Sequence, residues 1–178
     1  EHFEELCIKN NPSLAIIVHV LGHANDMKEL LRICKKYDVI LIEDSCEALG
    51  SEFLGKKLGS ISKAGSFSFY YGHHISTIEG GMVVTNDDDL YYDMMSIRSH
   101  GWARDLPIDI HEKWRLDSGV DEVRDLYTFY HPGFNLRSTD LNAFLGISQL
   151  KKLDRIVDAR EKNSNVYKKH LSDYWVQS

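Results

Sequence analysis

The sequence predicts an α/β protein built on a mostly parallel sheet. Residues 14–20 (LAIIVHV) and 39–42 (VILI) are continuous apolar runs with the length of strands that are buried on both faces. Between them, residues 26–37 carry apolar side chains at an i, i+3, i+4, i+7 spacing from Met27, with Asp26 at the N-cap position of an amphipathic helix. Strand, helix and strand make a βαβ unit, which requires parallel strands covered by helices.

The rest of the chain continues this alternation of elements. Further strands are expected at 64–69 and 82–85. A helix is expected to follow at 87–99, and the acidic residues 87–89 at its start would cap it. Residues 101–128 are polar and without periodicity, which predicts a long loop or a short helical excursion. A helical pattern resumes at Thr139 and continues, more charged, towards the C-terminus.

Composition limits the classes of function. The chain has 178 residues, of which 43% are hydrophobic and 27% charged, as in a soluble globular domain. A net charge of -6 gives no basic surface for nucleic acid. No apolar stretch reaches the roughly 18 residues that span a bilayer, and no signal-peptide pattern is present, so we expect a cytoplasmic protein without membrane contact. Three cysteines without C-x-x-C spacing argue against a disulfide framework or a metal site.

Two adjacent histidines, His73 and His74, are candidate reactive groups. They follow an aromatic strand that breaks at Gly72, within the segment SFSFYYGHHISTIEGGMVVT at 66–85. Strand ends in α/β sheets are where ligands bind and where catalytic groups are usually mounted. A histidine pair in a loop is nevertheless more often a solvated surface feature, so these two residues alone do not establish a site.

A second candidate is Asp44, which follows Glu43 at the end of the apolar run. A carboxylate in this position needs a partner, and the protonated ring nitrogen of a pyridine cofactor is one that fits. A charge-assisted hydrogen bond of this kind contributes about 1.5–3 kcal/mol, and it makes the ring a stronger electron sink. The alternative is a strand-end carboxylate that caps the following turn.

Four stretches carry a family resemblance: IEDSCEALGSEFLGKKLGS, AGSFSFYYGHHISTIEGGMVVTN, IRSHG and YHPGFNLRSTDLNAFLGISQLKKLD. Together, from about Ala15 to Lys162, they resemble the DegT/DnrJ/EryC1/StrS-type family of pyridoxal-phosphate (PLP) sugar aminotransferases and dehydratases. The resemblance implies the three-layer α/β/α large domain of a fold type I enzyme, in the central portion of a longer chain. We expect a cofactor-binding portion over 1–140 and a helical segment leading towards the small domain over 141–178.

His73 departs from the common family pattern. Most members have a lysine there, five residues after the serine that corresponds to Ser68, and this lysine holds the cofactor covalently. The histidine branches are the GDP-4-keto-6-deoxymannose and CDP-4-keto-6-deoxyglucose 3-dehydratases, which use dissociable pyridoxamine 5'-phosphate (PMP) to remove the sugar 3-hydroxyl. In the CDP branch a cysteine-rich insert holds an iron-sulfur cluster. No cysteine follows Cys46, so the resemblance favours the GDP branch without a cluster.

The resemblance assigns His73 as the catalytic base and acid. It assigns binding of PMP or PLP to four residues: Asp44, Glu47, Ser68 and Asn135. Asn135 corresponds to a residue that reaches the cofactor phosphate of the opposite subunit, which implies a homodimer with shared active sites. For Glu47 and Ser68 the alternatives are surface exposure and a structural strand hydroxyl.

Three further residues are weaker candidates for substrate binding: His100, Arg137 and His74. His100 can instead stabilise a helix C-terminus, since its side chain can interact with the helix dipole. Arg137 can instead pair with Asp140, and His74 can be structural.

The implied reaction is removal of the 3-hydroxyl from a GDP-linked 4-keto-6-deoxyhexose, with L-glutamate as amino donor, on the way to 3,6-dideoxysugars of surface polysaccharides. Two alternatives stay open. One is a CDP-4-keto-6-deoxyglucose 3-dehydratase, and the other is a non-catalytic family fragment that binds a nucleotide sugar or the cofactor.

Overall fold

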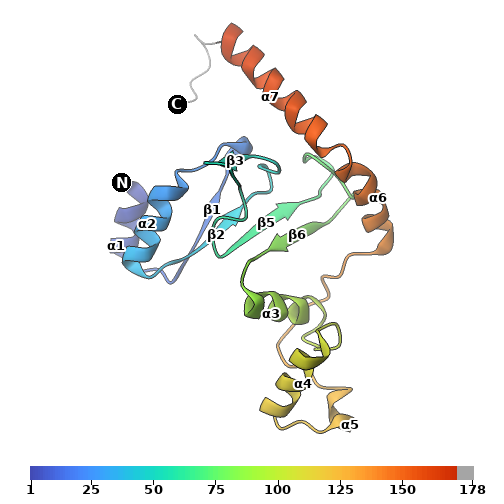
Figure 1. Ribbon diagram of the computed structural model, residues 1–178. Coiled ribbons are helices and arrows are strands. Elements are labelled where there is room, and N and C mark those ends of the chain that lie inside the picture. Colours follow the sequence, from blue (N-terminus) through green and yellow to red (C-terminus); the bar gives the residue numbers. More distant parts are fainter. Residues whose placement is uncertain (172–178) are drawn as a thin grey trace. The chain divides into compact units, whose positions relative to one another are not determined.

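The computed structural model describes residues 1–171 and contains a four-stranded sheet, which Figure 1 shows with its labelled strands. The strands lie in the order β1 (Leu14–Val18), β2 (Ile40–Asp44), β5 (Ala64–Ser68) and β6 (Gly81–Val84). β1, β2 and β5 are parallel, and β6 pairs antiparallel with β5. The predicted α/β class with a mostly parallel sheet is therefore confirmed.

Two helices, α1 (His2–Asn10) and α2 (Met27–Tyr37), form the hydrophobic core with the sheet. As predicted, α2 begins after Asp26, whose carboxylate accepts a hydrogen bond of 3.1 Å from the backbone N–H of Glu29. The buried core residues come from α1, α2, β2 and the segments on either side of β2, and they are Cys7, Met27, Ile33, Cys34, Val39, Leu41, Ala48 and Leu58.

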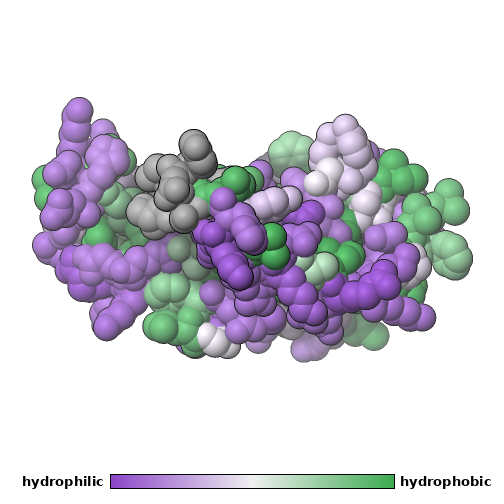
Figure 2. Space-filling view, turned by 90° about the horizontal axis from the view of Figure 1, so that it is seen from above, coloured by the Kyte–Doolittle hydropathy of each residue, from purple (hydrophilic) through white to green (hydrophobic). Residues whose placement is uncertain are grey.

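One face of β1 and β2 is uncovered. Ile16 exposes 63% of its surface and Ile40 exposes 49%, and Leu14 and Val18 are also exposed. The expectation that both strands are buried on both faces is wrong for these side chains. Successive residues of a strand point to opposite faces, and the described part of the chain covers only the face that carries Leu41. Figure 2 likewise shows hydrophobic residues reaching the surface among hydrophilic ones.

The loops and later helices of the same compact unit complete its structure. A 3-10 turn, η1 (Val20–Gly22), follows β1, and β3 (Glu52–Phe53) pairs antiparallel with β4 (Lys56–Lys57). Two helices end the described chain, α6 (Asp140–Leu150) and α7 (Leu153–His170). The side chain of Asn142 on α6 donates hydrogen bonds to the carbonyls of Thr77, at 2.6 Å, and Glu79, which anchors the helix to the loop between β5 and β6.

Residues 85–139 form a second compact unit. It contains α3 (Asp88–Arg98), α4 (Ile108–Asp117) and α5 (Glu122–Asp125), so the region at 101–128 is helical in part, as expected. His111 on α4 and Tyr130 both hydrogen-bond to Asp125 Oδ1, which fastens the short helices together. None of the helices in residues 1–171 is long and apolar enough to cross a bilayer.

The first prediction concerns the start of α2. Asp26→Ala removes the acceptor for the N–H of Glu29, and loss of such a cap lowers the free energy of unfolding by about 1 kcal/mol. Urea unfolding followed by circular dichroism measures the change. Lys28→Ala, at an exposed site on the same helix, is the control, and an equal effect of both substitutions would contradict the capping role.

Candidate active site

Asp44 lies at the carboxyl end of β2, opposite Ser66 of the neighbouring strand β5. Its Oδ1 accepts a hydrogen bond of 3.1 Å from the backbone N–H of Cys46, and the Ser66 hydroxyl lies 3.5 Å away. Because β2 and β5 are parallel, this pair stands at the edge of the sheet where ligands of α/β proteins usually bind.

Asp44 is held in its ionised form. Burial by itself would raise the pKa of the carboxyl, but the hydrogen bonds from Cys46 and Ser66 outweigh it, and the pKa is lower than usual. The positive charge of His73, when it is protonated, also lowers the pKa of Asp44, as a smaller effect. Burial raises the pKa of the Cys46 thiol to about 11, which leaves this group protonated and unreactive at neutral pH.

His73 is mounted on the turn that follows β5. The Ser68 hydroxyl accepts a hydrogen bond from the N–H of Tyr70, and the N–H of His73 in turn donates to the carbonyl of Tyr70 at 3.1 Å. The imidazole stands edge-on to the Tyr70 ring, with 5.6 Å between the ring centroids. Its Nδ1 is buried and has no hydrogen-bond partner among the described residues, as is also true of His74 Nδ1.

His74 and Glu47 belong to the same cluster. Burial lowers the pKa of His74, as do the positive charges of Arg160 on α7 and of a protonated His73, whereas the charge of Glu47 raises it. Glu47 Oε2 accepts a hydrogen bond of 2.7 Å from the backbone N–H of Leu21, so the carboxylate is anchored. Arg160 was not predicted from the sequence, because only the packing of α7 brings it near the histidines.

The remaining candidates lie in the second unit. His100 follows α3 with a left-handed φ of 65°, and its N–H donates to the carbonyl of Phe134 at 2.7 Å. Asn135 forms an isolated antiparallel bridge with Ser99, so these two segments lie side by side. Arg137 is exposed. The roles of His100, Asn135 and Arg137 in cofactor or substrate binding stay predictions.

Sequence reasoning missed two buried polar residues, Glu43 and His19. Both side chains are fully buried, and Glu43 Oε2 lies 3.1 Å from His19 Nε2. The sequence contained an indication of this burial. Glu43 lies two residues after the core residue Leu41 on β2, and side chains two residues apart on a strand point to the same face, here the core. A glutamate at such a position requires hydrogen-bonding partners.

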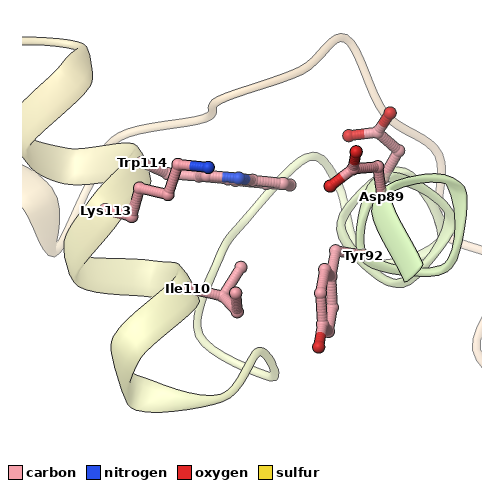
Figure 3. A pocket seen from close by; sticks show the side chains of 6 residues that line it. Asp89, Tyr92, Ile110, Lys113 and Trp114 are labelled. Carbon is pink, nitrogen blue, oxygen red and sulfur yellow. The ribbon is translucent and has the colours of Figure 1, made fainter.

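The second unit contains a cavity of about 150 Å³ between α3 and α4. Figure 3 shows Ile110, Lys113 and Trp114 pointing from α4 towards Asp89 and Tyr92 on α3. Its lining includes none of the predicted site residues. Within residues 1–171, no three histidine, cysteine or carboxylate side chains gather as a metal-binding group.

Comparison with known proteins identifies the family. Residues 4–177 match the model of the DegT/DnrJ/EryC1/StrS aminotransferase family. The chain belongs to this family. The resemblance seen in the sequence is therefore confirmed, together with the fold type I class of PLP enzymes.

Similar proteins include GDP-4-keto-6-deoxy-D-mannose 3-dehydratase of Yersinia pseudotuberculosis, which is 36% identical over 89% of this chain and 40% of its own length. The E. coli GDP-4-keto-6-deoxy-D-mannose-3-dehydratase with bound hydrated PLP is 35% identical with a TM-score of 0.84, over 97% of this chain and 43% of that one. A GDP-4-keto-6-deoxymannose-3-dehydratase with a trapped PLP-glutamate geminal diamine matches equally well, at 35% identity and a TM-score of 0.84, over 97% and 44%. The chain spans about two fifths of the length of these relatives.

The second prediction concerns His74. Its pKa should lie below the ordinary value of 6.5, so the neutral imidazole predominates at pH 7 and protonation begins only as the pH falls. Glu47→Gln removes the charge that raises this pKa and should lower it further, whereas Arg160→Gln should raise it. NMR titration of the ring C–H signals, assigned with His74→Gln, measures all three values. Shifts in the same direction for both substitutions would contradict the arrangement.

Proposed function

We propose that this chain carries the catalytic portion of a PMP-dependent 3-dehydratase that acts on a nucleotide-linked 4-keto-6-deoxyhexose. The observation that supports the proposal is the position of His73 on the turn after β5, the strand that pairs with the end of β2 at Asp44, in a segment (66–85) that contains no lysine. A lysine would attach the cofactor covalently, and a histidine leaves it dissociable.

The residues present fit the cofactor. Asp44 would be the partner of the pyridine nitrogen, since its lowered pKa keeps it negative, and Ser68 would hold the phosphate. Asn135 would reach the cofactor phosphate of the opposite subunit. Glu47, anchored by the N–H of Leu21, would stand next to the cofactor ring. The buried Nδ1 atom of His73, which lacks a partner within residues 1–171, is available for a bound group. When bound, PMP supplies an amine for the sugar 4-keto group and a ring that accepts electrons.

His73 moves the protons. Imidazole is the side chain that enzymes most often use as a general base and general acid, which contributes about 10²- to 10⁴-fold in rate. In the proposed reaction His73 removes a proton from the methylene carbon of the cofactor and delivers a proton to the departing 3-hydroxyl oxygen of the sugar. Asp44 keeps its charge throughout and favours the protonated pyridine nitrogen.

GDP-4-keto-6-deoxymannose is the favoured substrate. The GDP-sugar dehydratases named above support it, and the absence of cysteine after Cys46 disfavours the branch with an iron-sulfur cluster. L-Glutamate is the proposed amino donor, in line with the PLP-glutamate adduct of a relative. His100, Arg137 and His74 would contact the sugar nucleotide. A cytoplasmic homodimer with shared active sites belongs to the same proposal.

Product analysis tests the reaction. The protein is given PMP, glutamate and either GDP-4-keto-6-deoxymannose or CDP-4-keto-6-deoxyglucose, and the sugars are analysed by mass spectrometry. Loss of the 3-hydroxyl from the GDP sugar alone is the expected result. Loss from the CDP sugar alone would overturn the nucleotide assignment. Cofactor binding with no product from either sugar would favour a non-catalytic binding role.

The third prediction concerns His73. His73→Asn should lower the dehydration rate by at least about 10²-fold, because the proton-transferring group is lost. His73→Lys should suppress dehydration and attach PLP covalently, which borohydride reduction and mass spectrometry of the intact protein detect. Dehydration at an unchanged rate in either variant would remove His73 as the base.

The fourth prediction concerns Asp44. Asp44→Asn removes the charged acceptor of the pyridine nitrogen, and loss of a charge-assisted hydrogen bond of 1.5–3 kcal/mol corresponds to roughly 10- to 150-fold weaker cofactor binding. Titration of cofactor absorbance measures the dissociation constant. Asp38→Asn is a matched control at an exposed left-handed position that asparagine tolerates. Equal affinities of the two variants would exclude Asp44 from the site.

A further inference from the structure

The buried pair of Glu43 and His19 takes no part in the proposed chemistry. Both side chains are completely shielded from solvent, and Glu43 Oε2 lies 3.1 Å from His19 Nε2. A buried carboxylate is costly unless it is paired and fully hydrogen-bonded. The partners of this pair therefore show which parts of the protein it holds together.

Glu43 accepts five hydrogen bonds. Besides His19, its Oε2 accepts the backbone N–H of Gly59 at 2.8 Å. Its Oε1 accepts the N–H groups of Ile61 and Ser62, both at 2.8 Å, and the Ser62 hydroxyl at 3.0 Å. Burial alone would raise the pKa of Glu43. The hydrogen bonds that it accepts, with those from Gly59 and Ser62 as the strongest, outweigh burial and lower the pKa, so the carboxylate is charged.

His19 extends the network to the end of β1. The backbone N–H of Asn25 is a donor and lies 3.3 Å from His19 Nδ1, which must therefore accept. The hydrogen on the imidazole is then at Nε2 and points to Glu43. The backbone N–H of His19 also donates to the carbonyl oxygen of Asp44 at 3.0 Å. His19 thus contacts both carboxylate-bearing residues at the end of β2.

The segment that Glu43 binds leads directly into β5. Gly59 approaches this strand so closely that a Cβ on Gly65 would lie 2.0 Å from the carbonyl oxygen of Gly59. The next residue, Ser66, carries the hydroxyl near Asp44 Oδ1. The Glu43 carboxylate lies on the core face of the sheet and holds the end of β2 and the entry to β5 in place. The same two strands carry the candidate site on the opposite face of the sheet.

We propose that Glu43, oriented by His19, is a positioning residue for Asp44, which rests on the proposed function of Asp44 as the partner of the pyridine nitrogen. Glu43 sets the alignment of β1, β2 and the entry to β5, and so fixes the direction of the Asp44 carboxylate and the position of Ser66. Its effect on the cofactor passes through Asp44 and involves no contact of its own.

Glu43→Gln tests this role because it keeps the shape and removes one acceptor. In either orientation the new amide NH₂ faces at least two hydrogen-bond donors, Gly59 and His19 on one side or Ile61 and Ser62 on the other. We expect about 10-fold weaker PLP and PMP binding and a shifted absorbance maximum of the bound cofactor, measured by titration below the melting temperature of the variant. Glu52→Gln, at a more exposed strand glutamate, is the control and should bind normally.

The double variant Glu43→Gln/Asp44→Asn separates positioning from a general loss of stability. If Glu43 acts through Asp44, the double variant should bind cofactor within about 2-fold of Asp44→Asn alone. A further 10-fold loss would overturn the proposal, because independent effects multiply. Binding by Glu43→Gln with unchanged affinity and spectrum would also overturn it.

A second pair of variants, at His19, tests the positioning role if Glu43→Gln does not fold. His19→Gln keeps an N–H donor for Glu43 and should retain affinity and spectrum, whereas His19→Phe keeps a ring without the donor and should lose both. Equal behaviour of these two variants would overturn the positioning role. If the unsubstituted protein binds no cofactor, the proposed function itself fails. If the unsubstituted protein binds cofactor and the Glu43 and His19 variants bind it with the same affinity and spectrum, only the positioning role is rejected.

Discussion

The structure of the sheet unit depends on the parallel pairing of β2 between β1 and β5. This pairing brings Asp44 opposite Ser66 and the end of β1 against the end of β2. Because side chains alternate along a strand, the consecutive carboxylates of Glu43 and Asp44 point to opposite faces, one into the core and one to the open face. The five residues of β2 therefore contribute side chains both to the core and to the candidate site.

Much of this fold could be predicted because its signals are local. The apolar spacing and the Asp26 cap defined α2 to within a residue, and the βαβ unit followed from it. Burial could not be predicted in the same way. An apolar run such as LAIIVHV indicates a strand with hydrophobic side chains, but it does not show whether other elements pack against both faces of that strand. Ile16 and Ile40 are accordingly exposed where burial was expected.

The candidate site was predictable to the extent that its residues lie on strand ends. Asp44 ends β2, Ser68 ends β5 and His73 lies on the turn after β5, and the strands β2 and β5 are neighbours in the sheet. Arg160 was beyond reach because it comes from a distant helix through packing alone. Glu43 received no role from the sequence, although its position along β2 indicated the core face, because its hydrogen-bond donors come from segments distant in the chain, among them the N–H groups of Gly59 and Ile61.

The alternation along β2 also explains why two adjacent carboxylates have different roles. Each has its own donors: the core-facing one accepts five hydrogen bonds, whereas the one on the open face accepts from the N–H of Cys46 and lies 3.5 Å from the Ser66 hydroxyl. A slip of the strand by one residue that brought Asp44 to the position of Glu43 would turn Asp44 towards the donors of the core and Glu43 to the open face, away from Ser66. The shorter side chain would not reach those donors, so the hydrogen-bonded glutamate fixes the register that leaves its neighbour on the open face.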